Sequence, residues 1–219
     1  MKKRSGLLIA VKLIFILSLF VLLYSVVQVI KAPIEAHNAL NEWSKKREEA
    51  SAHTLSREET PLPEGMVSPI QQNSSSTPSY TEGEIIGEIS FPSIHKKVAI
   101  VEGTASRQLK KGAGHYKGSA ALGGIGNSVL AGHRDTVFRG LGELKKNDLI
   151  EVESIDGKFV YKVTGSNIVD GHERGAIKQS AEPILTLITC YPFSYVGSAP
   201  DRYLLTAKLV GRDETLPGS

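Results

Sequence analysis

The sequence predicts an all-β globular domain at residues 82–212, built as a closed β-barrel or a β-sandwich. About six to eight short runs of apolar and β-branched residues occur there, and clusters of turn residues separate them. One pair of runs flanks Asp156-Gly157, a frequent turn in β-hairpins. Almost no segment in this range repeats its apolar residues with the period of a helix. Many short strands with turns between them are typical of barrels and sandwiches.

The expected strands, in chain order, cover residues 84–91, 98–101, 127–133, 149–154, 158–164, 167–169, 184–190 and 202–210. A single helical turn is expected at residues 107–111. The glycine-rich stretch at 112–126 is interpreted as β-turns, because a phosphate-binding loop would end in Gly-Lys-Ser/Thr and open a helix.

The chain opens with a basic tip at residues 1–6 and an almost wholly apolar run at residues 7–30. At about 1.5 Å per residue, a helix of this length can cross an apolar layer of about 30 Å. A cleaved signal peptide is the alternative, but its apolar region is about 7 to 15 residues long and ends at a small-residue site. The length therefore predicts a transmembrane anchor in a single-pass cell-membrane protein. Its basic flank would be cytoplasmic and its globular domain extracellular.

Two further segments separate this run from the globular domain. Residues 31–60 carry mixed charge and good helix formers, which predicts a helical stalk. We interpret the stalk as a solvated spacer, with a partner-binding helix as the alternative, and the sole tryptophan, Trp43, could rest near the membrane interface. Residues 61–81, rich in Pro and Ser, predict a flexible linker. A polar tail at residues 213–219 ends the chain.

Composition excludes several classes of function. The formal net charge is only +3, and no dense block of Lys and Arg follows the N-terminus, so nucleic-acid binding is not expected. A single cysteine excludes an internal disulfide framework. Neither the CxxC nor the HExxH spacing of zinc sites is present, and no EF-hand pattern occurs. We expect no metal and no cofactor, although acidic loops could hold Ca²⁺ weakly.

The one cysteine, Cys190, ends the strand expected at residues 184–190, where Tyr191-Pro192 interrupts the hydrogen-bond ladder. If this strand and the next pair as an antiparallel hairpin, Arg202 falls within reach of Cys190. A cation beside a thiol favours the thiolate, which is the reactive form. A lone cysteine is more often a small core residue, so at this point both interpretations stand.

A second strand ends on His133, which supplies a proton carrier that works near neutral pH. Thiol catalysis needs a nucleophile, such a carrier and a cation for developing negative charge, and a barrel rim could bring the three together. His115, in a glycine turn, is the one further site candidate. The other histidines lie in the stalk, beside lysines or in a polar loop, and are expected to be solvated: His37, His53, His95 and His172.

Three motifs together resemble the signature of sortases, the membrane-anchored cysteine transpeptidases of Gram-positive-type bacteria. They are Ala-Gly-His-Arg at 131–134, Thr-Leu-Ile-Thr-Cys at 186–190 and the downstream Arg202. The resemblance covers about residues 84–210 and favours a catalytic Cys190. It implies a sortase-type closed β-barrel of about eight strands with short helices. Cys190-Tyr191-Pro192-Phe193 and the loop before Arg202 are most similar to class D sortases.

The resemblance also implies an activity and its partners. The substrate would be a surface protein with a C-terminal Leu-Pro-x-Thr-Gly or Leu-Pro-x-Thr-Ala signal, cleaved after Thr and transferred to an amine of a cell-wall precursor. Cys190 would form the thioacyl enzyme, His133 would move the proton and Arg202 would stabilise the oxyanion. The substrate-binding residues implied or considered as candidates are Ala131, Thr189, Tyr191 and His115.

Two alternatives to surface-protein anchoring are open. A class C-like pilin polymerase is disfavoured, because the lid that this class usually carries has an Asp-Pro pair, whereas no such pair precedes the barrel here and the chain ends in polar residues. A non-catalytic, membrane-tethered peptide-binding module would use the same rim to dock an extended peptide. The complete Cys190, His133 and Arg202 set argues against it, because a binder needs no nucleophile. Thiol redox chemistry is disfavoured because a resolving cysteine is absent.

Overall fold

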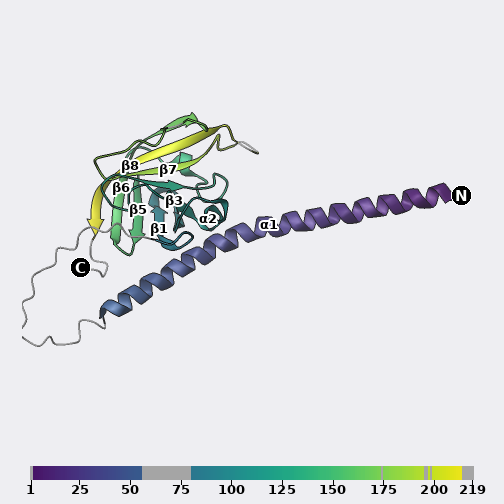
Figure 1. Cartoon of the computed structure of the whole chain (residues 1–219), viewed down its shortest axis with the longest axis horizontal. Helices are drawn as coiled ribbons and strands as arrows, with labels where there is room; N and C mark the ends of the chain where they lie inside the picture. Colours follow the sequence, from purple (N-terminus) through teal and green to yellow (C-terminus); the bar gives the residue numbers. More distant parts are fainter. Residues whose placement is uncertain (1, 56–79, 174, 195–196, 198, 214–219) are drawn as a thin grey trace, which may run out of the picture.

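A computed structural model of the 219-residue chain describes residues 2–55, 80–173, 175–194, 197 and 199–213 (Figure 1). The side chains of residues 2–10, 28–33, 53–55 and 213 are not described. Nearly all of the linker and the tail predicted from the sequence therefore lie outside the described residues. The strands are β1 (Ile85–Phe91), β2 (Lys96–Glu102), β3 (Ala113–His115), β4 (Asn127–Ala131), β5 (Leu149–Ser154), β6 (Gly157–Asp170), β7 (Ile184–Tyr191) and β8 (Asp201–Asp213). The helices are α1 (Lys2–Leu55) and α2 (Ser106–Lys111), with 3₁₀ turns η1 (Pro92–Ile94) and η2 (Leu141–Glu143).

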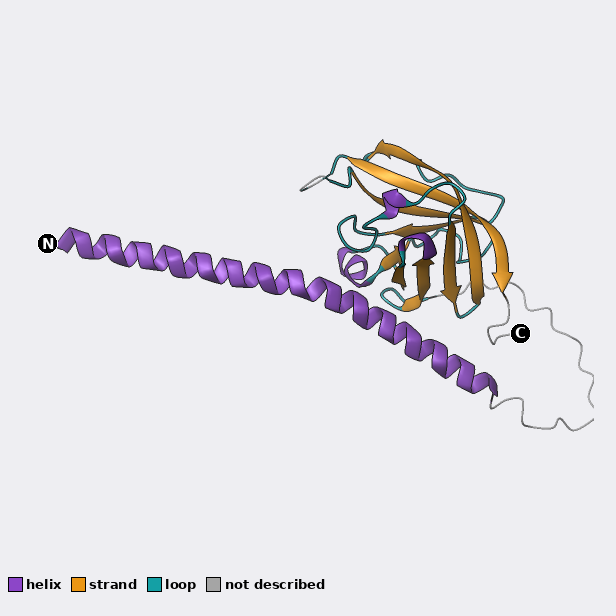
Figure 2. Cartoon of the chain, turned by 180° about the vertical axis from the view of Figure 1, so that it is seen from behind, coloured by secondary structure: helices purple, strands orange, loops and turns teal. Residues whose placement is uncertain are grey.

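The eight strands close into one barrel in the order β1-β2-β3-β4-β7-β8-β6-β5, which confirms the barrel and excludes the sandwich (Figure 2). The pairs β2·β3 and β4·β7 are parallel, and the other neighbours are antiparallel. The parallel β4·β7 pair matters most for function, because it aligns the ends of two strands that are distant in sequence.

Alternate residues of each strand fill the barrel with apolar side chains. Ile89, Ile100, Leu187 and Leu205 are fully buried in one continuous core, and burying a side chain of this size contributes about 1.5–3 kcal/mol. Tyr161 brings a polar atom into this core, and its hydroxyl accepts the Gly123 N–H at 2.8 Å. Burial raises the pKa of Tyr161 to about 12, so the hydroxyl stays neutral.

Two expectations about the strands need correction. The segments predicted as separate strands at 158–164 and 167–169 form one 14-residue strand, β6. Both parts pair with β8, and a register shift between Val163 and Gly165 accommodates the irregularity. Residues 113–115, predicted as turn, form β3 beside β2. A Cβ at Gly112 would collide with the Ala99 backbone oxygen, so glycine permits this close approach.

The stalk predicted at residues 31–60 is not a solvated spacer along its whole length, because part of helix α1 packs on the barrel. Trp43 is 1% exposed and packs with Ala39 against the outward side chains of β1 and β2, namely Ile85, Ala99 and Val101. It therefore lies on the barrel. Figures 1 and 2 show the C-terminal half of α1 crossing the barrel while its N-terminal half extends away.

Charged contacts also hold α1 on the barrel. Lys46 Nζ lies 3.3 Å from Glu84 Oε1 and donates to the Ile85 carbonyl at 3.1 Å. The Thr81 backbone N–H, and then Lys46, hold the pKa of Glu84 below its ordinary value of 4.5. Arg47 adds a contact to both oxygens of Glu153, at 3.2 and 3.3 Å. The docked part of α1 is thus fixed by one aromatic residue and two ion pairs.

Across the residues that the structure describes, no helix combines the length and the apolar character that a membrane span requires. The anchor expected at residues 7–30 stays a prediction.

Candidate active site

The strand β7 places its only thiol on the outer face of the barrel. Leu185, Leu187 and Thr189 are buried, and the alternation of a strand turns Ile188 and Cys190 to the opposite face. Cys190 is half-buried and reduced. In the β7·β8 register its cross-strand partner is Arg202, as the hairpin expected from the sequence requires.

His133 reaches the same edge through the parallel pairing of β4 with β7. Ala131 pairs with Ile188, and the Gly132 N–H donates to the Ile188 carbonyl at 3.0 Å. His133 and Cys190 each lie two residues farther along their strands, so continuing the register brings them side by side. His133 is exposed. The three residues predicted to act together therefore share one rim of the barrel.

A buried hydrogen bond holds these two strand ends together. The Thr189 hydroxyl donates to the Gly132 carbonyl at 2.7 Å, and Thr189 is 3% exposed. There is no room for a side chain at Gly132, because a Cβ there would lie 2.6 Å from the Phe138 ring and 2.8 Å from Val137. Thr189, expected to contact substrate, has its side chain inside the protein. There it links the residue before His133 to the residue before Cys190.

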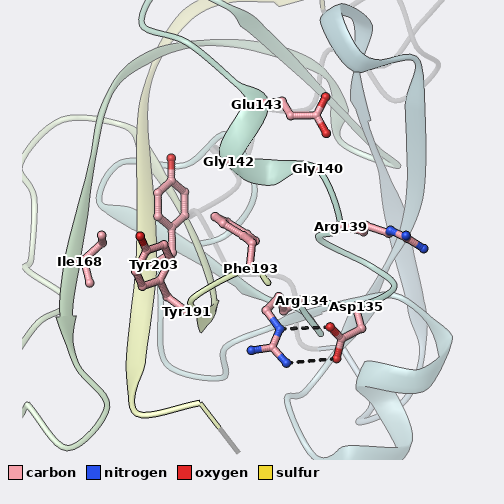
Figure 3. Close-up of a pocket in the computed structure, with 10 residues that line it drawn as sticks. All are labelled: Arg134, Asp135, Arg139, Gly140, Gly142, Glu143, Ile168, Tyr191, Phe193 and Tyr203. Carbon is pink, nitrogen blue, oxygen red and sulfur yellow. Dashed lines mark hydrogen bonds and ion pairs between the residues drawn. The ribbon is translucent and has the colours of Figure 1, made fainter. Parts of the chain in front are cut away.

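Arg134 belongs to the site, although sequence reasoning did not select it as a site residue. Its side chain is 6% exposed and Nη1 donates to the Pro192 carbonyl at 2.9 Å. Nε and Nη2 donate to the two carboxylate oxygens of Asp135, at 3.0 and 3.4 Å (Figure 3). The residue after His133 thus fixes the segment that follows Cys190. Its position beside His133 was the only signal in the sequence.

Arg202 is oriented by its own loop. Nη1 donates to the carbonyls of Ala199 and Asp201, at 3.2 and 2.9 Å. Within the described residues no acceptor engages Nε or Nη2, so these donors can serve a substrate. Gly171 lies against this guanidinium: a Cβ there would lie 3.1 Å from Nη1 and would collide with the Pro200 carbonyl oxygen.

Two cavities flank the rim. The outer groove has a volume of about 430 Å³ and is lined by residues of β6, β7 and β8 and of the segment between β6 and β7, including Val169, Glu173, Ile177, Ile188, Arg202 and Leu204. The rim pocket has a volume of about 630 Å³ and is lined by residues from the segment after β4 and from the strand ends, including Asp135, Glu143, Ile168, Tyr191, Phe193 and Tyr203 (Figure 3).

The other predicted substrate-binding residues lie in three different settings. Ala131 is half-buried beside Ile188 on the outer face. Tyr191 lines the rim pocket and stacks on Tyr203, with ring centroids 6.3 Å apart. His115 is buried: Nδ1 lies 2.8 Å from Glu102 Oε2, and Nε2 lies 3.0 Å from the Ala120 carbonyl oxygen. Both ring nitrogens of His115 are therefore occupied by protein partners.

The segment after His133 is also attached to β2. Lys96 Nζ donates to the carbonyls of Thr136 and Arg139, at 2.7 and 2.9 Å. Burial, followed by the positive charge of Arg139, lowers the pKa of Lys96. In the described part of the chain no three His, Cys, Asp or Glu side chains cluster as a metal site would require. The chemistry available at the rim is that of a thiol, an imidazole and a guanidinium.

Comparison with known proteins gives the family. The Sortase domain model matches residues 89–210. Sortase D of Bacillus subtilis (strain 168) is 45% identical over 129 residues, which cover 58% of this chain and 65% of that protein. Sortase A of Bacillus anthracis is 29% identical over 137 residues, covering 61% and 63%. The chain thus spans slightly less than two thirds of the length of these curated relatives.

Solved structures agree with this assignment. The catalytic domain of SrtD from B. anthracis is 40% identical with a TM-score of 0.54, and the match covers 66% of this chain and 99% of that one. A Clostridium perfringens Sortase D5 transpeptidase has a TM-score of 0.61 at 24% identity, covering 81% and 99%, and supports the fold. The D designation of the B. subtilis and B. anthracis SrtD relatives agrees with the class D resemblance. Since the family model covers more than half of the chain and the barrel carries the predicted triad at one rim, the chain belongs to the sortase family.

Proposed function

We propose that this chain is a cysteine transpeptidase that cleaves a Leu-Pro-x-Thr-Gly or Leu-Pro-x-Thr-Ala signal after Thr and transfers the acyl group to an amine. One observation carries the proposal. The cross-strand pair of Cys190 and Arg202 lies beside the strand end that bears His133, next to an open groove. A nucleophile, a proton carrier and a cation in one place are what acyl transfer requires.

In the first half-reaction the Cys190 thiolate attacks the carbonyl carbon of Thr, and a C–S bond forms. Negative charge develops on the carbonyl oxygen, and the Nε and Nη2 donors of Arg202 are free to stabilise it. Protonated His133 donates a proton to the departing amine nitrogen as the C–N bond breaks. The products are a thioacyl enzyme and a free peptide amine.

In the second half-reaction an incoming amine attacks the thioacyl carbon and forms a new C–N bond. His133, now neutral, accepts the proton that the amine loses. The C–S bond breaks and the thiolate of Cys190 is restored. Water can replace the amine, which gives hydrolysis, so the fate of the thioacyl enzyme depends on how well the acceptor is held.

The outer groove is the proposed binding place of the sorting signal. Its wall offers the apolar side chains of Val169, Ile188 and Leu204, with Arg202 at the same face. Apolar lining with one oriented charged group is typical of sites that bind a short peptide. A Leu-Pro segment would pack on the apolar part while Thr reaches the thiol.

A membrane location and a cell-wall acceptor are part of the same proposal. Apolar side chains along residues 11–27 of α1 are exposed, for example Ile14 and Phe20 at 67% each, and a bilayer would cover them. A structure of C. perfringens sortase C, 28% identical with a TM-score of 0.54, is described with the C-terminal cell wall sorting motif. These observations support an extracellular enzyme that attaches surface proteins to a cell-wall amine.

Mass spectrometry of the full chain in detergent micelles tests the function. The chain is incubated with Leu-Pro-x-Thr-Gly and Leu-Pro-x-Thr-Ala peptides, with and without an amine acceptor, beside Cys190→Ala. We expect a thioacyl adduct and an amine-exchanged product that both require Cys190. Binding of the peptides without any adduct or cleavage would contradict the enzyme and favour a peptide-binding module.

A further inference from the structure

A third cavity lies where α1 leaves the barrel, and the proposed transfer chemistry does not use it. Its volume is about 390 Å³, and it is lined by residues of α1, β2, α2 and the segment after β4. Figures 1 and 2 both show α2 beside α1, at the edge of the barrel from which the N-terminal half of α1 extends. None of Cys190, His133 and Arg202 lines this cavity, which we call the junction pocket.

The junction pocket is rich in positive charge. Its ionisable lining residues are His37, Lys96, Lys97, Lys110, Asp135 and Arg139. Asp135, the one carboxylate among them, already pairs with a neighbouring arginine, and Lys97 lies 2.8 Å from Glu88. Lys110 and Arg139 are exposed, and within the described residues their side chains have neither a hydrogen-bond nor an ion-pair partner. Two cations of the lining are therefore available to an anion.

Lys96 shows that this positive charge is not balanced inside the junction pocket. Burial, and then the positive charge of Arg139, lowers the pKa of Lys96, and the opposing effect of Glu143 is smaller than that of Arg139. Figure 3 shows the Arg139 side chain pointing away from the aromatic rings of the rim pocket. An anion in the junction pocket would offset the repulsion between these two cations, because an opposite charge nearby favours the charged form of each.

Most of the remaining lining is apolar. Ala36 and Leu40 of α1 contribute to it, together with Val98 and Ala99 of β2 and with Val137. A phosphate ion would leave these side chains in contact with water, whereas an amphipathic anion would cover them. A phospholipid has this combination, because its charged phosphodiester is joined through glycerol to acyl chains. The charge and the apolar lining together therefore favour a lipid headgroup over free phosphate.

The position of the junction pocket along α1 fits the surface of a membrane. The apolar run expected to span a bilayer ends at residue 30, and the first residue of α1 in the lining is Ala36. At about 1.5 Å per residue, six residues of helix separate the two by about 9 Å. The polar layer on each side of the hydrocarbon core is about 5–8 Å thick. A helix that crosses the bilayer at this run thus places the pocket at the outer edge of the headgroup layer, and a tilt of about 20° brings it closer.

We propose that the junction pocket binds the headgroup of an anionic phospholipid and so holds the barrel at the bilayer surface. The inference rests on the proposed membrane location and adds a lipid site that the transfer reaction does not require. Lys110 and Arg139 contact the phosphate oxygens, while Leu40 and Val98 pack on the glycerol and the first carbons of the acyl chains. Because α1, α2 and β2 all line the pocket, a bound lipid also strengthens the docking of α1 on the barrel.

Thermal unfolding of the full chain in dodecyl maltoside micelles tests the proposal, because a ligand that binds only the folded chain raises Tm with its concentration. Dihexanoylphosphatidylglycerol, dihexanoylphosphatidylcholine and sn-glycerol 3-phosphate are titrated in parallel. Each cation contributes about fivefold to the binding of an anionic lipid, so two should favour phosphatidylglycerol over the zwitterionic lipid by about 25-fold. Lys110→Gln and Arg139→Gln should each raise the phosphatidylglycerol concentration of half-maximal effect about fivefold.

Lys162→Gln is the matched control, because Lys162 is an exposed cation of β6, which β1 and β5 separate from β2. It should leave the lipid response unchanged. Equal responses of the parent chain, Lys110→Gln and Arg139→Gln would overturn the junction-pocket assignment. An equal effect of glycerol 3-phosphate and phosphatidylglycerol would replace the lipid site by a phosphate site. Release of the chain from phosphatidylglycerol vesicles by alkaline carbonate would contradict the membrane location on which the inference rests. None of these outcomes depends on the Cys190 reaction, which the peptide assay tests separately.

Discussion

Replacing Thr189 by valine should cost both stability and catalysis through one hydrogen bond. Its hydroxyl donates to the Gly132 carbonyl at 2.7 Å in a position that is 3% exposed. Valine fills nearly the same space but leaves that buried carbonyl without a donor, which costs about 1–3 kcal/mol. For a domain of this size, 1 kcal/mol corresponds to about 4 °C in Tm. Thr189→Val should therefore lower Tm by about 4–12 °C.

The catalytic loss follows because the bond joins the ends of the two strands that carry His133 and Cys190. A displacement of about 1 Å between reacting groups can reduce a rate about a hundredfold. We expect the rate of thioacyl formation, followed by mass spectrometry under single-turnover conditions, to fall about ten- to a hundredfold. Peptide affinity should change little, since Thr189 does not line the outer groove.

Thr186→Val is the matched control. Thr186 lies on the same strand, is 4% exposed and donates its hydroxyl to Asn127 Oδ1 at 2.8 Å, at the opposite end of the β4·β7 pair. Its loss should lower Tm by a similar amount while thioacyl formation stays near the parent rate. Equal rates for the two variants would refute the argument that Thr189 positions the catalytic residues.

Two further predictions rest on single contacts. Gly171→Ala should lower kcat/KM for the sorting-signal peptide about tenfold, because its Cβ would collide with the Pro200 carbonyl oxygen and press on the Arg202 guanidinium. Gly165→Ala, whose Cβ meets nothing within 4 Å, should change kcat/KM less than twofold, and an equal loss in both variants would contradict this role of Gly171. The Thr81 backbone N–H, and then Lys46 of α1, hold the pKa of Glu84 below 4.5. The Lys46 contact therefore stabilises docking of α1 above pH 4.5, and this contribution is lost as pH falls through the lowered value. Fluorescence of Trp43, the sole tryptophan, should therefore shift to the red below pH 4.5, whereas Glu84→Gln should remove that step; a pH step that persists in this variant would assign it to another group.

The catalytic pair of Cys190 and Arg202 could be predicted from local sequence because a hairpin leaves little freedom. The end of one strand must lie beside the start of the next in any antiparallel pairing. His133 was harder to place. Its proximity depends on the parallel β4·β7 pair, which joins segments more than fifty residues apart, and no local pattern encodes that pairing. The resemblance of the motifs to those of sortases, and not the periodicity of apolar residues, predicted that His133 lies beside Cys190.

The positions that sequence reasoning missed are those whose environment is created by distant segments. An arginine is usually exposed, yet the side chain of Arg134 is buried, and its guanidinium donates hydrogen bonds to the Pro192 carbonyl and to Asp135. The sequence analysis placed Trp43 near the membrane interface. One feature of the sequence nevertheless indicated the surface of the barrel on which Trp43 packs. Residues 98–101 are apolar at four successive positions, which indicates a strand covered on both faces. The helix α1 provides the outer cover.

The segment between β4 and β5 bears His133, the proton carrier of both proposed half-reactions. It runs from residue 132, just after the end of β4, to residue 148, just before β5. Arg134 attaches its start to the carbonyl at residue 192, at 2.9 Å. Lys96 attaches its middle to β2 through two carbonyl oxygens, at 2.7 and 2.9 Å. Because the first attachment begins at the residue that follows His133, a shift of this segment would move the proton carrier relative to Cys190.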